Sequence, residues 1–150
     1  MDDLRAVTTE FFRLEGWSYV TVEDQPELKF VYQGQTGNWM CVVRLQEADQ
    51  QWLFFSISPL DAPEETRAAT MEYLTRANYG MTIGNFEMDL DDGEVRFKTS
   101  LDVHGDRLSP ALVKQQVYAN VNAMDFYLTG LIEVMEGRAS PLAAITAIER

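Results

Sequence analysis

Apolar residues recur along this chain at two different spacings, and each spacing is typical of one kind of secondary structure. Near the N-terminus, Leu4, Val7, Phe11 and Leu14 are separated by three or four positions. That spacing places them on one face of an α-helix. The pattern therefore predicts a helix over residues 3–15.

Short segments with the composition of β-strands follow this helix. They are rich in β-branched and aromatic residues, and polar or turn-forming residues separate them. The predicted strands cover residues 17–22, 28–33, 39–45 and 51–57. Since the connections are short, we expect these strands to form an antiparallel meander.

The strands at 39–45 and 51–57 are apolar on both faces. A sheet with one face in water alternates apolar and polar residues, and these two strands do not. One face could hold Trp39, Cys41, Val43 and Leu45 with Leu53, Phe55 and Ile57, and the other Met40, Val42 and Arg44 with Trp52, Phe54 and Ser56. Both faces therefore need cover, either from the chain's own helices and loops or from a second copy or a bound partner.

A second helix and a hairpin follow. Asp61 and Glu64 have the spacing of a helix capping box, and the helix should end near Asn78. The next strands, 84–90 and 95–103, alternate apolar and charged residues, so one of their faces should contact water. Between them lies Asp92-Gly93, which is favourable for a tight primed turn.

Two further helices end the chain. Ser109 and Pro110 form an N-cap and first helical residue, and the apolar pattern continues to residue 136. This helix would be ~40 Å long, and it is apolar on two sides, so it is deeply buried, shared between subunits, or bent near Gly130. Ser140 begins a short final helix in the same way.

The order of elements is α-β-β-β-β-α-β-β-α-α over one domain, residues 1–150. It predicts an α+β fold, with a mostly antiparallel sheet and helices packed on it.

Charge narrows the classes of function. The chain has 24 acidic and 12 basic residues, a net charge of -12. An acidic protein is poorly suited to nucleic acid or to anionic lipid, so we expect neither as a partner. No apolar run approaches the ~20 residues of a membrane span, and the N-terminus does not resemble a signal peptide. We therefore expect a cytoplasmic protein.

No residue pattern specifies catalysis, a metal or a cofactor. Cys41 is the one cysteine and is expected in the core, and His104 is the one histidine. The acidic run from Glu87 to Glu94 does not have the spacing of a calcium loop, so we interpret it as a solvated hairpin tip. We expect no cofactor and no metal.

Several short motifs are similar to those of the YbjN-like family. They are Arg76-Ala-Asn-Tyr-Gly80, Ile83-Gly-Asn-Phe-Glu-Met-Asp-Leu90 and Asp92-Gly-Glu-Val-Arg-Phe97. This family is associated with bacterial sensory transduction regulators. The resemblance implies a fold like that of type III secretion chaperones, which hold extended partner segments on apolar surfaces, and it implies no catalytic residues.

The sequence thus predicts a non-enzymatic regulatory or chaperone-like module that acts through contacts with a protein partner or with itself as a homodimer. The predicted contact surface consists of Met40, Val42, Trp52 and Phe54. The alternative is a small-molecule-binding domain or an unrecognised enzyme, with a polar pocket between helix and sheet near His104 and Asp106.

Overall fold

The computed structural model describes residues 3–149, and over this range it contains the predicted elements in the predicted order. The α+β fold is therefore confirmed. The elements are α1 (Leu4–Glu15), β1 (Val20–Thr21), β2 (Glu27–Gln33), β3 (Asn38–Gln46), β4 (Gln51–Ile57), the 3-10 helix η1 (Glu64–Thr66), α2 (Arg67–Asn78), β5 (Asn85–Met88), β6 (Val95–Asp102), α3 (Pro110–Met135) and α4 (Pro141–Glu149).

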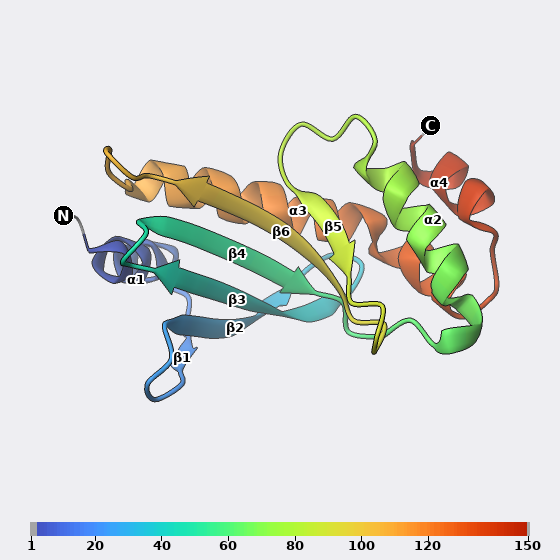
Figure 1. Cartoon of the computed structure of the whole chain (residues 1–150), viewed down its shortest axis with the longest axis horizontal. Helices are drawn as coiled ribbons and strands as arrows, with labels where there is room; N and C mark the ends of the chain where they lie inside the picture. The colour runs from blue at the N-terminus through green and yellow to red at the C-terminus, as the bar shows by residue number, and fades with distance from the viewer. Residues whose placement is uncertain (1–2, 150) are drawn as a thin grey trace.

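The strands form one antiparallel sheet in the order β1-β2-β3-β4-β6-β5. Helices α1 and α3 lie behind this sheet in Figure 1, and no helix lies in front of it. Helices α2 and α4 pack on the C-terminal half of α3, beyond the β5 edge. The sheet therefore has one face covered by helices and one face without helices, which we call the open face.

The hydrophobic core lies between the sheet and the helices behind it. Trp52 and Phe54 of β4 are fully buried there. The indole Nε1 of Trp52 donates a hydrogen bond to Thr8 Oγ1 of α1, over 3.1 Å. On the other side of the core, Asn120 of α3 donates to the carbonyl oxygen of Phe54, over 3.0 Å. These bonds tie both helices to the same face of the sheet.

The predicted pairing of faces on β3 and β4 is wrong. Val43 lies opposite Phe54, and Val42 lies opposite Phe55, and opposite residues of an antiparallel pair point to the same face. Phe54 is therefore in the core, whereas Val42 points to the open face. The predicted surface of Met40, Val42, Trp52 and Phe54 combines residues from both faces.

The connection between these strands explains the error. Gln46 pairs with Gln51, so four residues separate the strands, and Gln50 has a positive φ of 53°. With four connecting residues, an even-numbered position of β3 lies opposite an odd-numbered position of β4. The prediction places even-numbered positions of both strands on one face, and a shift of one residue moves every side chain of a strand to the other face.

The hairpin of β5 and β6 also differs from its prediction. The backbone N–H of Gly93 donates to Asp89 O, and the N–H of Asp89 donates to Glu94 O. This is a four-residue loop with a positive φ at Gly93, whereas the predicted primed turns have two-residue loops. Gly93 is also packed against the backbone of Ala62, which leaves no room for a Cβ atom.

The first predicted strand is shorter than expected, because Trp17 leaves the sheet and packs with Phe11 and Phe30. The long helix α3, in contrast, is continuous through Gly130. Its second apolar side is covered only in part: Tyr127 and Val134 are buried where the C-terminal half of α3 packs on α2 and α4, whereas Phe126 is 51% exposed. A Cβ atom at position 130 would lie 2.5 Å from Tyr73 Oη, so the glycine allows α2 to approach.

Candidate protein-binding face

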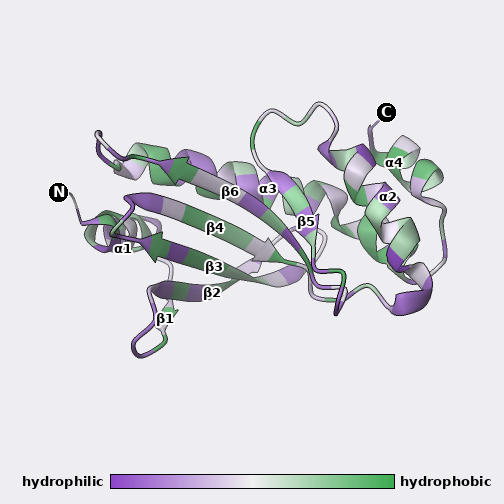
Figure 2. Ribbon diagram, in the orientation of Figure 1, coloured by the Kyte–Doolittle hydropathy of each residue, from purple (hydrophilic) through white to green (hydrophobic). Residues whose placement is uncertain are grey.

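The open face is built from alternate residues of the strands. Because opposite residues share a face, the pairing along the sheet identifies them. They are Val20 of β1, Glu27, Lys29, Val31 and Gln33 of β2, Asn38, Met40, Val42, Arg44 and Gln46 of β3, Gln51, Leu53, Phe55 and Ile57 of β4, Arg96, Lys98, Ser100 and Asp102 of β6, and Asn85 and Glu87 of β5. Figure 2 shows hydrophobic colour along β3 and β4.

The centre of this face is apolar and lies partly beneath arginine side chains. Phe55 is only 2% exposed although no helix covers it. The guanidinium carbons of Arg44 and Arg96 lie 5.1 and 4.1 Å from the centre of its ring. Such cation–π contacts are attractive, and they leave the charged groups at the surface.

Around this covered centre, apolar side chains are accessible. Val31 is 58% exposed and Met40 is 41% exposed. They lie opposite each other on neighbouring strands, and Met40 in turn lies opposite Ile57. They form a contiguous apolar row across three strands, which a partner could cover.

Cations border the apolar centre, and each pair of them shares one carboxylate. Glu27 accepts from Arg44 Nε over 2.9 Å, and its other oxygen lies 3.9 Å from Lys29 Nζ. On the opposite side, Glu87 accepts from Arg96 Nε over 2.6 Å and from Lys98 Nζ over 3.3 Å. Four cations are thus paired with two carboxylates.

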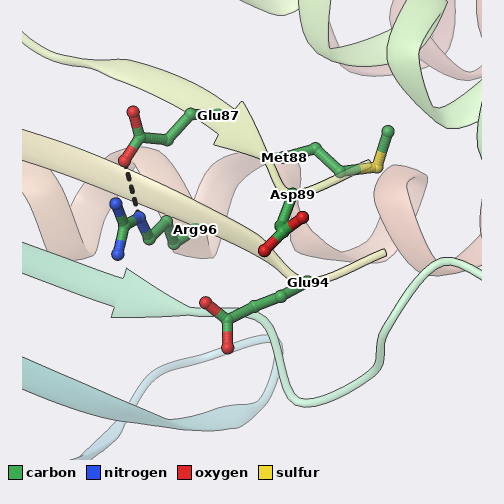
Figure 3. Close-up of a pocket in the computed structure, with 5 residues that line it drawn as sticks. All are labelled: Glu87, Met88, Asp89, Glu94 and Arg96. Carbon is green, nitrogen blue, oxygen red and sulfur yellow. Dashed lines mark hydrogen bonds and ion pairs between the residues drawn. The ribbon is translucent and has the colours of Figure 1, made fainter. Parts of the chain in front are cut away.

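Figure 3 shows the Glu87–Arg96 pair at one end of the face. Partial burial raises the pKa of the Glu87 carboxyl, but the hydrogen bonds and charges of Arg96 and Lys98 outweigh it, so the pKa is lowered. Glu87 is therefore ionised at neutral pH beside both cations.

A cavity of about 230 Å³ lies beside this pair, lined by Glu87, Met88, Asp89, Glu94 and Arg96. It belongs to the acidic hairpin tip. Within residues 3–149, no group of three His, Cys, Asp or Glu side chains is arranged to hold a metal ion. We therefore assign no ligand to this cavity.

The other candidate residues lie away from the open face. His104 is exposed in the turn after β6, where its backbone N–H donates to Asp102. One cavity is lined by residues 16–18 and 30–33, and another is lined by Gln35 and Thr36 together with Asn122, Asp125 and Phe126. Another cavity, at the end of β6, is lined by Gln51, Leu53, Ser100, Leu101 and Asp102, so it lies close to His104 along the chain, but neither His104 nor Asp106 lines it.

Cys41 lies in the core, as the sequence predicts. Burial raises the pKa of its thiol to about 12, although hydrogen bonds from Ser56 and Trp39 oppose the shift. A thiol with so high a pKa is a poor nucleophile at neutral pH.

Sequence reasoning missed the apolar residues that β4 contributes to the open face, namely Leu53, Phe55 and Ile57. The predicted contact surface omits them because the predicted register of β3 and β4 is wrong. The one signal that could have found them is the connection between the strands, because its length decides which residues share a face.

The architecture is that of a known class, an antiparallel sheet with helices on one face, as in type III secretion chaperones. A chain of the crystal structure of the ExsC–ExsE complex has the same fold, with a TM-score of 0.55 and 12% identity. That match covers 86% of this chain and 96% of the other. The predicted chaperone-like fold is confirmed.

The chain belongs to the YbjN family, described as "Putative bacterial sensory transduction regulator", whose pattern matches residues 6–133. The crystal structure of YbjN from E. coli, described as a putative transcription regulator, has a TM-score of 0.62 and 12% identity. The match covers 87% of this chain and 90% of the E. coli YbjN chain. No curated protein is similar enough in sequence to match the chain.

None of the helices within residues 3–149 is both long and apolar enough to cross a bilayer.

Proposed function

We propose that this chain is a non-enzymatic, cytoplasmic protein-binding module with a regulatory or chaperone-like role, and that it binds its partner on the open face of its sheet. The observation that carries the proposal is the apolar row of Val31, Met40 and Ile57 on a face that has no helix in front of it. Exposed apolar patches on soluble domains often mark interaction sites.

The comparisons support the same class of function. The family description is that of a regulator, and the ExsC–ExsE structure is a complex of two proteins. Of the residues predicted from the sequence, Met40 and Val42 point to the open face, where Met40 is 41% exposed and Val42 is 6% exposed. Trp52 and Phe54 do not, because both are fully buried beneath α1 and α3.

The test is capture of binding proteins from a lysate of the source cell with the immobilised full chain. A double variant, Val31→Thr with Met40→Gln, removes exposed apolar surface without changing charge or truncating a core residue. Leu142→Gln on α4 is the matched control, since Leu142 is 54% exposed and lies on a helix that packs beyond the β5 edge of the sheet.

We expect at least one protein to bind the original chain and the control equally and the double variant about tenfold less. A tenfold loss corresponds to ~1.4 kcal/mol, which is reasonable for two partly buried apolar contacts. If every captured protein binds all three chains equally, the open face is not the binding surface. A homodimer through this face is the alternative, and light scattering of the three chains would reveal it.

A further inference from the structure

The charges on the open face are arranged in order of distance from its centre. The pairing of strands places Lys29 directly beside Val42, and Lys98 directly beside Phe55. Arg44 and Arg96 lie over Phe55 itself. The apolar centre is therefore surrounded first by cations.

The acidic residues of this face lie farther out. Glu27 is on β2 and Glu87 is on β5, on either side of the strands that carry the apolar centre. Asp102 is at the far end of β6, where it accepts from the backbone of His104. The acidic tip at Asp89 and Glu94 is also at the margin, beside the cavity next to Arg96.

This order is unusual for the molecule as a whole. The chain has 12 basic residues against 24 acidic ones, yet four cations border this one apolar centre. A partner lying on Val42 and Phe55 would meet ammonium and guanidinium groups before it met a carboxylate. Charge complementarity therefore favours negative groups on the partner, next to its apolar side chains.

The cations are also free to change partners. Their side chains are 31–37% exposed, and each of the two glutamates is shared between two of them. An exposed ion pair contributes only ~0–1 kcal/mol. A carboxylate from a bound partner can therefore replace or share these pairs at little cost.

We propose that the open face binds an acidic amphipathic segment of a protein partner, whose apolar side chains cover Val31, Met40 and Ile57 and whose carboxylates pair with the surrounding cations. This inference rests on the proposed function and names the chemistry of the partner. Apolar contact supplies most of the affinity, and the charges decide which segments are accepted.

The test uses matched synthetic peptides with the full chain. The peptides are about ten residues long, enough to cross four strands that are ~4.8 Å apart. They share the same apolar residues and differ in having Glu, Gln or Lys at the polar positions. Backbone amide shifts in NMR spectra locate the binding, and titration gives the affinity.

We expect the Glu peptide to shift amides of β2, β3, β4 and β6 and to bind about tenfold more tightly than the Lys peptide. This ratio follows from four weak charge contacts. The affinity of the Glu peptide should fall as salt is added, because salt screens exposed charges.

Lys29→Gln with Lys98→Gln should weaken binding of the Glu peptide by about threefold or more. The matched control, Lys114→Gln with Arg138→Gln, changes the net charge equally at residues outside the open face. It should leave the affinity unchanged. Equal losses in both double variants would overturn the proposed local role of these cations.

The remaining outcomes of the peptide titrations and of light scattering also test the proposal. If the three peptides bind the face equally, the partner's charge is wrongly assigned while the proposed function stands. If none binds, or if the shifts lie elsewhere, the acidic-segment proposal is overturned, and the capture experiment judges the proposed function separately. If light scattering shows a dimer that Val31→Thr with Met40→Gln abolishes, a second copy is the occupant.

Discussion

Asp125 of α3 shows how one side chain can hold a distant turn. Its carboxylate accepts from the backbone N–H groups of Gln35 and Thr36 at 2.9 and 2.8 Å, and from Thr36 Oγ1 at 2.6 Å. Burial raises the pKa of Asp125, but these hydrogen bonds outweigh it and lower the pKa. A Cβ atom at Gly34 would lie 2.8 Å from Asp125 Oδ1, so this close approach requires glycine.

Asp125→Asn should lower the free energy of unfolding by about 1–3 kcal/mol, since hydrogen bonds to a charged acceptor are among the stronger ones. Urea unfolding measures the loss, and Asn122→Ala, at an exposed position one turn earlier, is the control. The pKa of Asp125 is lowered in the folded state, so its contribution is present above its usual pKa and is lost as pH falls. A difference that persists undiminished at strongly acidic pH would contradict this role.

Cys41 should make the stability of the fold depend on pH at alkaline values. Its thiol has a pKa near 9 when unfolded and about 12 when folded, so folding is favoured below pH 9 and weakened between pH 9 and 12. Between pH 8 and 10.5, the original chain should lose about 1–2 kcal/mol more stability than Cys41→Ala. Every other titratable group is common to both chains, so the difference isolates Cys41, and an identical loss of stability in both chains would contradict the assignment.

Strand β4 shows how a single element serves two different environments. Trp52 and Phe54 pack beneath the helices with their rings stacked, 6.0 Å apart. Phe55 points the other way, and the long, partly exposed side chains of Arg44 and Arg96 lie over its ring. Burial is almost equal for the two phenylalanines, at 0% and 2% exposed, but Phe54 is buried beneath helices and Phe55 beneath partly exposed arginine side chains.

Truncating these residues should reveal the difference. Phe54→Ala leaves a cavity in a packed core, and we expect a loss of about 3–5 kcal/mol. Phe55→Ala should cost roughly half as much, because Arg44 and Arg96 can move into the space and remain hydrated. Chemical denaturation measures both. Equal losses would mean that the open face is as rigidly packed as the core.

For the whole molecule, net charge and local charge have different meanings. The net charge of -12 opposes compaction through repulsion that acts over the entire surface. On the open face, however, cations surround the apolar centre. The overall acidity therefore does not predict the charge of the segment that a protein partner places on this face, because that segment meets only the surface that it covers.

Added salt should have opposite effects on stability, which the overall repulsion lowers, and on binding, which the cations of the open face favour. Raising the ionic strength from ~0.01 M to ~0.15 M shortens the screening length from about 30 to about 8 Å. We expect the free energy of unfolding to rise by about 1 kcal/mol as repulsion weakens, while binding of an acidic peptide weakens. Lys114→Gln with Arg138→Gln should enlarge the rise in stability. A fall in stability with salt would mean that ion pairs outweigh the repulsion.

The element order could be predicted from the sequence because its signals are local. The spacing of Leu4, Val7 and Phe11 specifies α1, and Ser109-Pro110 specifies the beginning of α3. These patterns depend on periodicity and capping within one segment, which no distant contact needs to support.

Which face of β3 and of β4 enters the core was decided only by the tertiary structure. Both faces of β3 and β4 are apolar, so hydrophobicity could not choose between Phe54 and Phe55 for the core. The four-residue connection and the packing of α1 and α3 made that choice. The sequence by itself determined which segments form helices and strands, because those preferences are local. It left the binding face undetermined, because a register depends on pairing between strands and a one-residue slip reverses every side chain.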